Sequence, residues 1–287
     1  MSNHSHHHTR KRKKRIRNAV SVVLSFVLSI FFAILMCAVA LQFGFLDRDM
    51  ILAKINESNY YNEVYAELTD NIHTILKSKG LPETLLEDCI SNKRVYINGK
   101  QYIDNGLQGE DTVVELDNIK EEMNKILVSY YEEKQIPVDD KVRDNIDTVI
   151  NDVCTEYTRM VRFQFVSFIK DYKSMYRNIA IWLLPLLVVL SAVIIFTLLK
   201  IHRYPHRGVR YTAISLASAS MLNLCLPLYC LINKVYNRLD ILPVYYEQFL
   251  QSYMENSLWA YVYVGAFGLL LTAILCGGVR VLKHNIS

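Results

Sequence analysis

The chain has 287 residues, a net charge of +4 and 52% hydrophobic residues, values that an ordinary globular chain of one or two domains also shows. The distribution of charge excludes a soluble fold, because four segments of 21 to 23 residues contain no Asp, Glu, Lys or Arg: 19–41, 179–199, 211–233 and 257–279. A helix of about 20 residues crosses the roughly 30 Å hydrocarbon layer of a membrane. The sequence therefore predicts an all-α integral membrane protein with four transmembrane helices.

The charged residues between these segments predict the orientation of the chain. The N-terminal tail, the link between the second and third segments and the C-terminal tail contain 13 Lys and Arg and no acidic residue. The other two links contain 19 Lys and Arg against 28 Asp and Glu. Because cytoplasmic loops are enriched in Lys and Arg, both termini are predicted to be cytoplasmic, in a plasma membrane.

The predicted order follows from these two patterns. It is a basic cytoplasmic tail (1–18), a transmembrane helix (19–45), an extracytoplasmic helical domain (46–178), a second transmembrane helix (179–199), a cytoplasmic loop (200–210), a third transmembrane helix (211–233), an extracytoplasmic amphipathic loop (234–256), a fourth transmembrane helix (257–279) and a cytoplasmic tail (280–287).

Two features of the N-terminal region have alternative interpretations. His4, His6, His7 and His8 can bind a metal weakly, but a disordered tail is favoured, and the basic run after them is attributed to topology and lipid attraction rather than nucleic acid. Ala38-Val39-Ala40 is typical of a signal-peptidase site. The apolar run before that site has about 22 residues, longer than the 7–15 of a signal peptide, so a retained signal anchor is favoured.

The extracytoplasmic domain contains 25 acidic and 17 basic residues, and its patterns are helical. Apolar residues from Ile51 to Ile75 follow the spacing of one helix face and predict a helix that starts after Asp47 and is stopped by Gly80 and Pro82. A second helix is predicted over 116–135, before Pro137. The segment 93–103 fits either a hairpin with an Asn98-Gly99 turn or a helix running on from Leu85, and the helix is favoured.

A third helix of this domain is predicted to start at Asp139 or Asp140 and to continue without a break. Its apolar residues follow steps of three and four, with one polar interruption at Gln164. The segment from Asp140 to Ile179 contains no Gly or Pro. One continuous helix to Leu199 is therefore expected. It either transmits movement into the transmembrane helices or only holds the domain upright.

The link 234–256 predicts an aromatic helix capped by Asp240. The apolar face of this helix consists of Leu242, Tyr245, Tyr246, Phe249, Leu250 and Tyr253. Tyrosine favours the membrane interface, so an interfacial anchor is the first interpretation. Glu247 and Glu255 favour the alternative, in which the helix docks onto protein.

Few residues qualify as functional candidates. Cys89 and Cys154 are a candidate disulfide of the exported domain. Gly265, Gly268, Ala213 and Ala217 are predicted to let transmembrane helices pack closely. Asp47 and Asp49 can hold a divalent cation, but a helix start with an acidic first turn is favoured. Enzyme motifs are missing, so no catalytic residue, cofactor or metal is predicted.

The stretch from Phe45-Leu46-Asp47 through Glu57-Ser58-Asn59-Tyr60-Tyr61, with Val64-Tyr65 and Leu81-Pro82, resembles uncharacterised four-span membrane proteins of Gram-positive bacteria. The resemblance covers about the first half of the extracytoplasmic domain and implies a bacterial plasma membrane location without implying an activity. The order of spans and domain also resembles FtsX-like permeases in topology. The link 201–209 is too short for the coupling helix with which such permeases bind an ATPase.

These observations predict a non-enzymatic multi-pass membrane protein whose acidic outer domain binds a partner or senses a cell-surface condition. The expected partners are membrane lipid and either another protein or further copies of the chain. The alternative is a subunit of a transporter or channel. Ionisable residues are missing from the four apolar segments, whereas proton relays and ion-coupled carriers usually contain them.

Overall fold

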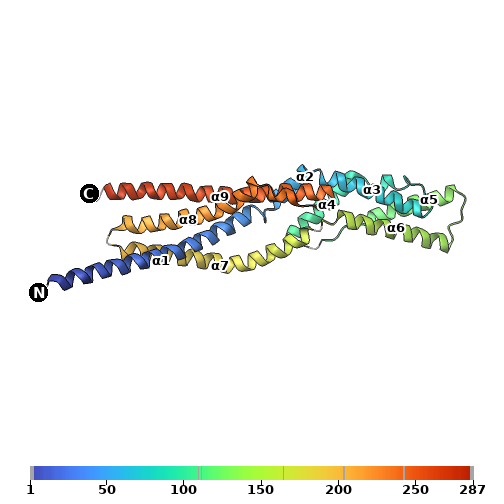
Figure 1. Cartoon of the computed structure of the whole chain (residues 1–287). Helices are drawn as coiled ribbons and strands as arrows, with labels where there is room; N and C mark the ends of the chain where they lie inside the picture. Colours follow the sequence, from blue (N-terminus) through green and yellow to red (C-terminus); the bar gives the residue numbers. More distant parts are fainter. Residues whose placement is uncertain are drawn as a thin grey trace. The chain divides into compact units, whose positions relative to one another are not determined.

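A computed structural model shows that the chain is built of helices (Figure 1). The structure describes residues 3–108, 110, 112–163, 165–202, 204–241 and 243–284. Nine α-helices, two short 3-10 helices and no strand occur over these residues. They form two compact units, a span unit (1–47, 175–239 and 251–287) and a hydrophilic unit (48–174 and 240–250). The predicted all-helical fold is confirmed.

Four helices are long and apolar enough to cross a membrane, as the charge-free segments predict. They are α1 (Asn3–Phe43), α7 (Phe165–Ile201), α8 (Pro205–Ile232) and α9 (Val244–His284). Apolar side chains such as Trp182, Leu226 and Tyr263 are exposed at 81%, 70% and 68%. Such surfaces fit contact with lipid, so the helices are compatible with a multi-pass membrane protein.

The hydrophilic unit has a core formed by amphipathic helices. Its helices are α2 (Arg48–Glu57), α3 (Tyr60–Ser78), α4 (Asn92–Gln108), α5 (Asp117–Glu133) and α6 (Asp140–Val161), with a 3-10 turn, η1, at Glu87–Cys89. Helix α3 packs against α4 and α6, and α5 packs against α6. The buried residues of α3 and α6 recur at steps of three and four, which places each set on one helix face.

Helix ends follow the local signals in the sequence. Gly80 has a φ of +74° just after α3, and Leu81 N–H donates to the Leu76 carbonyl at 3.0 Å, which together close the helix. Asp139 caps α6, because its carboxylate accepts from Val142 N–H at 2.9 Å. Helix α5 lies within the predicted range 116–135.

The segment 93–103 is helical, as favoured, but α4 begins at Asn92 and does not run on from Leu85. The Asn-Gly pair serves packing rather than a turn. A Cβ at Gly99 would collide with the ring of Tyr61, so glycine allows α4 to approach α3 closely. The neighbouring Asn98 amide donates to the Tyr157 hydroxyl at 2.9 Å.

The single helix predicted after Asp47 is wrong, because the chain breaks between α2 and α3. Asn59 adopts a left-handed conformation with φ 54°, which asparagine tolerates better than most residues. Ile55 and Val64 are both buried and are nine positions apart, about 180° around an ideal helix. The break therefore lets one core bury both faces.

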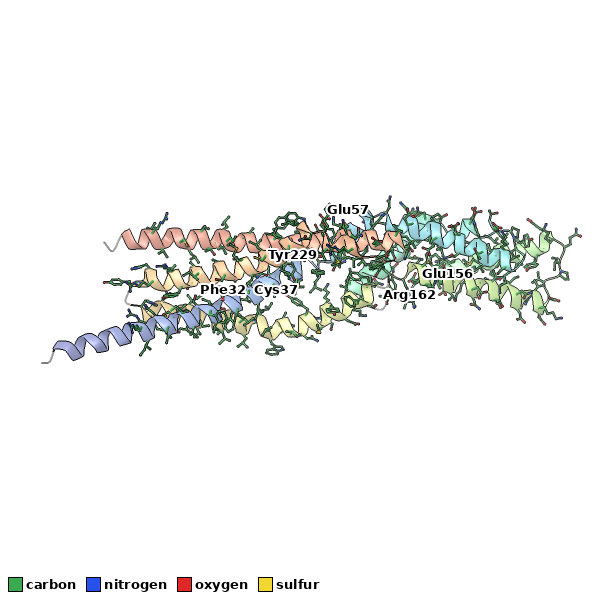
Figure 2. The ribbon with its side chains drawn as sticks, viewed as in Figure 1. Phe32, Cys37, Glu57, Glu156, Arg162 and Tyr229 are labelled. Atoms are coloured by element: carbon green, nitrogen blue, oxygen red, sulfur yellow. The ribbon has the colours of Figure 1, made fainter. Side chains whose placement is uncertain are left out.

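The continuous helix predicted from Asp140 to Leu199 is also wrong. Helix α6 ends at Val161, Arg162 is extended with ψ 109°, and α7 begins at Phe165 (Figure 2). Val161 and Phe163 are both fully buried, although two positions on a helix point about 200° apart. The extended residue solves this conflict without Gly or Pro. Gln164, the predicted polar interruption, lies outside the described residues.

The separate helix predicted in the link 234–256 is replaced by the first turns of α9. Helix α9 starts at Val244 and runs without interruption through the fourth apolar segment. The predicted cap at Asp240 is wrong, since the first amides, those of Tyr246 and Glu247, donate to the Pro243 carbonyl. Leu242 lies outside the described residues.

Substitution of Gly80 tests the end of α3. A Cβ there would meet no atom within 4 Å, so Gly80→Ala adds only the backbone strain of a left-handed alanine, about 1–2 kcal/mol. We expect a lower midpoint of thermal unfolding, measured by circular dichroism on the full chain. Gly80→Asn is the matched control and is expected to lose less. Equal midpoints for all three proteins would contradict the role of Gly80 as the left-handed residue that ends α3.

Candidate functional site

An aromatic core joins three segments of the hydrophilic unit. The ring of Phe163 lies 5.1 Å from that of Tyr60 and 5.0 Å from that of Phe249, in edge-to-face geometry. Tyr245 extends the core, 5.2 Å from Tyr60, and its hydroxyl donates to a Glu67 carboxylate oxygen at 2.8 Å. Each such pair contributes about 0.5–1.5 kcal/mol beyond its burial. The start of α9 is thereby fixed to the start of α3.

This core decides between the two interpretations of the link 234–256, an interfacial anchor or a helix docked onto protein. Tyr245, Tyr246 and Phe249 pack on protein within the hydrophilic unit, as the docking interpretation predicts. The sequence showed their common helix face. It gave no indication that their partner is Phe163, whose immediate neighbours in the chain are Arg162 and Gln164.

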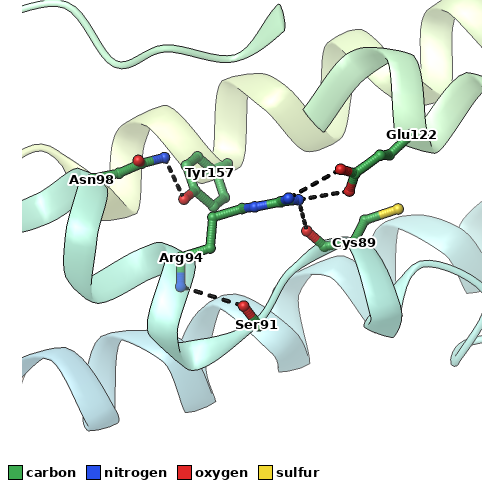
Figure 3. Close-up of polar contacts among 6 residues, drawn as sticks. All are labelled: Cys89, Ser91, Arg94, Asn98, Glu122 and Tyr157. Atoms are coloured by element: carbon green, nitrogen blue, oxygen red, sulfur yellow. Dashed lines mark hydrogen bonds and ion pairs between the residues drawn. The ribbon is translucent and has the colours of Figure 1, made fainter. Parts of the chain in front are cut away.

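A polar network around Arg94 connects α4, α5 and η1 (Figure 3). The guanidinium makes two bonds to the Glu122 carboxylate, at 2.7 and 3.0 Å, and donates to the Cys89 carbonyl at 2.6 Å. The hydrogen bond with Glu122 raises the pKa of Arg94, and the same bond lowers the pKa of Glu122. Both side chains are partly exposed, so the network is best explained as structural.

The candidate disulfide partners lie on different elements of the hydrophilic unit. Cys89 belongs to η1 and Cys154 to α6, and the structure describes both as buried free thiols. Burial raises the pKa of Cys89 to about 11 and also raises the pKa of Cys154. Because the thiolate is the reactive form, both thiols are expected to be inert in the folded chain. Their pairing stays a prediction.

Asp47 and Asp49, the candidate cation ligands, flank Arg48 at the start of α2, and Asp49 lies in the first turn of that helix. Arg48 forms an ion pair with Asp104 at 2.8 Å, which links α2 to α4. Among the described residues, no group of three or more His, Cys, Asp or Glu side chains is placed to hold a metal ion. The side chains of His4, His6, His7 and His8 are outside the part that the structure describes.

In the span unit, α1 and α8 pack along each other through a polar seam. Ser25 and Ser215 hydroxyls lie 2.8 Å apart, and Ser215 also donates to the Ser25 carbonyl at 2.7 Å. Further along, the Asn223 amide donates to the Ala33 carbonyl at 3.4 Å. Interhelical hydrogen bonds of this kind are typical of membrane helix pairs and contribute about 0.6 kcal/mol each. The packing prediction named Ala213 and Ala217 of α8 and no residue of α1.

The small residues predicted to allow close packing lie in or beside this seam. A Cβ at Gly268 would collide with Met36 of α1 and Ser220 of α8, and a Cβ at Gly265 would lie 2.6 Å from Leu224. Ala213 is buried on α8, while Ala217 is half-buried. Gly44 was not predicted, yet it brings the end of α1 within contact of Ala260 on α9.

An apolar cavity of about 730 Å³ lies among the four candidate spans. It is lined by some of the residues within 30–41 of α1 with Phe45, within 176–184 of α7 and within 222–230 of α8, and by Leu258 and Tyr261 of α9. Cys37 is one of the few polar groups on the wall (Figure 2). Binding pockets for small molecules are typically apolar and of 300–1,000 Å³. The cavity is therefore the candidate binding site of the span unit.

The fold and these sites define an all-helical chain with four candidate membrane spans, an aromatic core at the start of α9 and an apolar cavity. Comparison of the chain with protein-family models, curated proteins and solved structures finds no match. Its function is therefore inferred from its own chemistry.

The two thiols of the hydrophilic unit provide a test of burial and pairing. A rise in pKa from 9.0 to about 11 lowers the thiolate fraction of Cys89 about a hundredfold at pH 8. We expect slow alkylation of Cys89 and Cys154 by iodoacetamide in the folded chain and rapid alkylation in denaturant without reductant, read by peptide mass spectrometry. Peptides that are alkylated only after reduction would instead show the disulfide.

Proposed function

We propose that the protein is a non-enzymatic, multi-pass protein of a bacterial plasma membrane. Its hydrophilic unit lies outside the cell, where it binds a partner or senses a surface condition. The Lys and Arg residues at 10–17 and 200–210, in short segments next to the spans, support this orientation.

The main support for a binding or sensing role is that the aromatic core contains residues of two helices that continue into candidate spans. Tyr245 and Phe249 belong to this core and also to α9, which continues as one helix to His284. Phe165, whose ring lies 6.0 Å from that of Phe249, begins α7 in the same way. A partner that changes the packing of this core acts directly on two helices that continue into candidate spans.

The sequence suggested that movement of the outer domain passes into the spans through one continuous helix. We keep the proposal of such a connection but assign it to other helices. It runs through α7 and α9, because α6 is separated from α7 by the extended residue Arg162.

A second candidate function is a subunit of a transporter or channel, which the cavity among the spans favours. The wall of that cavity is apolar, and the charge-free segments contain no Asp, Glu, Lys or Arg. Ion pathways usually need such residues or water-filled surfaces. The binding or sensing role is therefore preferred.

The orientation is tested with two cysteine variants. Lys134 and Arg207 are both exposed, one just after α5 and one in the first turn of α8. We expect a membrane-impermeant maleimide to label Lys134→Cys on intact cells and to label Arg207→Cys only after permeabilisation. The wild-type chain, with its own six cysteines, gives the background. The reverse pattern would contradict the orientation.

The binding role is tested by photo-crosslinking in cells. Ile97, Val113 and Ile136 are apolar side chains exposed on the hydrophilic unit at 48%, 69% and 42%, and each is replaced by benzoylphenylalanine. We expect a discrete adduct with a protein or envelope component from at least one position, identified by mass spectrometry. Ile232→benzoylphenylalanine, at the end of α8, is the control for contacts of the spans. Absence of an adduct at all three positions would contradict the role, and an adduct with an ATPase would favour the transporter.

A further inference from the structure

We propose that the cavity among the spans binds one acyl chain of a membrane phospholipid, with Arg177 at its rim placed to bind the phosphate. This inference is independent of the partner-binding role, because every residue of the cavity wall belongs to the span unit.

The chemistry of the wall selects a hydrocarbon occupant. Two of its polar side chains are already hydrogen-bonded to the protein: the Tyr176 hydroxyl donates to the Ala38 carbonyl at 2.9 Å, and the Asn223 amide donates to the Ala219 carbonyl at 3.0 Å. A polar group of a ligand would be left without a hydrogen-bond partner in this cavity, which is unfavourable. An acyl chain has no such group, so it fills the apolar wall without leaving a polar group unpaired.

The position of the cavity along the helices fits a lipid from a single leaflet. The wall uses the C-terminal halves of the α1 and α8 spans and the N-terminal halves of the α7 and α9 spans. Residues 30–41 of α1 cover about 17 Å at 1.5 Å per residue. One leaflet contributes about half of the roughly 30 Å hydrocarbon layer. The depth of the wall therefore equals about one acyl region.

The positive charge of Arg177 at the rim suits the phosphate of a phospholipid headgroup. Arg177 is exposed and directly follows Tyr176, at the end of the α7 stretch that lines the cavity. It is three and seven positions before Ala180 and Leu184 of the wall, so it lies at the edge of the same helix face. Arginine binds phosphate oxygens through two parallel N–H bonds, and tyrosines such as Tyr176 are typical of headgroup depth.

Photolabelling of the purified full chain tests this proposal. The chain is placed in nanodiscs of phosphatidylethanolamine and phosphatidylglycerol, and the probe is phosphatidylglycerol with a diazirine in one acyl chain. We expect labels on the wall residues of α1 and α8, mapped by peptide mass spectrometry. Ala180→Trp fills the cavity and is expected to lower these labels about tenfold, equivalent to about 1.4 kcal/mol of binding free energy.

Two further variants separate the cavity from general lipid contact. Val189 is on the same helix, is exposed at 59% and lies outside the wall, so Val189→Trp is expected to leave the labels unchanged. Arg177→Gln is expected to reduce the phosphatidylglycerol that the chain retains in native mass spectrometry. This second readout holds even where Ala180→Trp fails to fold, which size-exclusion chromatography shows.

Three outcomes would overturn the proposal. One is uniform labelling of all exposed span surfaces that Ala180→Trp does not change. Another is unchanged lipid retention in Arg177→Gln. The last is a disulfide between two copies through Cys37 or Cys230 of the wall, which would show that a second chain occupies the cavity. Failure here leaves the partner-binding role intact, since that role is read from adducts of the hydrophilic unit.

Discussion

Hydrocarbon offers no hydrogen-bond partner to a polar group, and this constraint explains most features of the span unit. Each candidate span is a helix because only a helix satisfies its own amides within one segment. Ser25, Ser215 and Asn223, which lie in these segments, are bonded across or within the helices. The same constraint leaves the cavity with an apolar wall, which favours a lipid chain over a polar solute.

The hydrophilic unit obeys a different rule, since water is available and burial of large side chains decides its geometry. Phe163, Tyr60 and Phe249 come from three distant parts of the chain and form one core. That core accounts for the break between α6 and α7 and for the start of α9. Aromatic burial outweighs the local preference for a continuous helix, because several ring pairs exceed the cost of one extended residue.

Helices α7 and α9 contribute to both proposed activities. Phe165 and Phe249 lie in the aromatic core, while Tyr176 and Tyr261 lie in the cavity wall roughly a dozen residues later in each helix. Events in the core and occupancy of the cavity therefore act on the same two backbones.

The sequence by itself determined the number of apolar helices, the end of α3 at Gly80, the start of α6 at Asp139 and the common face of Tyr245, Tyr246 and Phe249. These features depend on local composition, on the spacing of apolar residues and on capping residues, all of which can be read from the sequence. The breaks at Asn59 and Arg162, the close approach of Gly99 to Tyr61, the pairing of Ser25 with Ser215 and the cavity came only from the tertiary structure. Each depends on contacts between residues far apart in the chain, where burial energy overrides local preference, and a single sequence does not reveal which distant side chains meet.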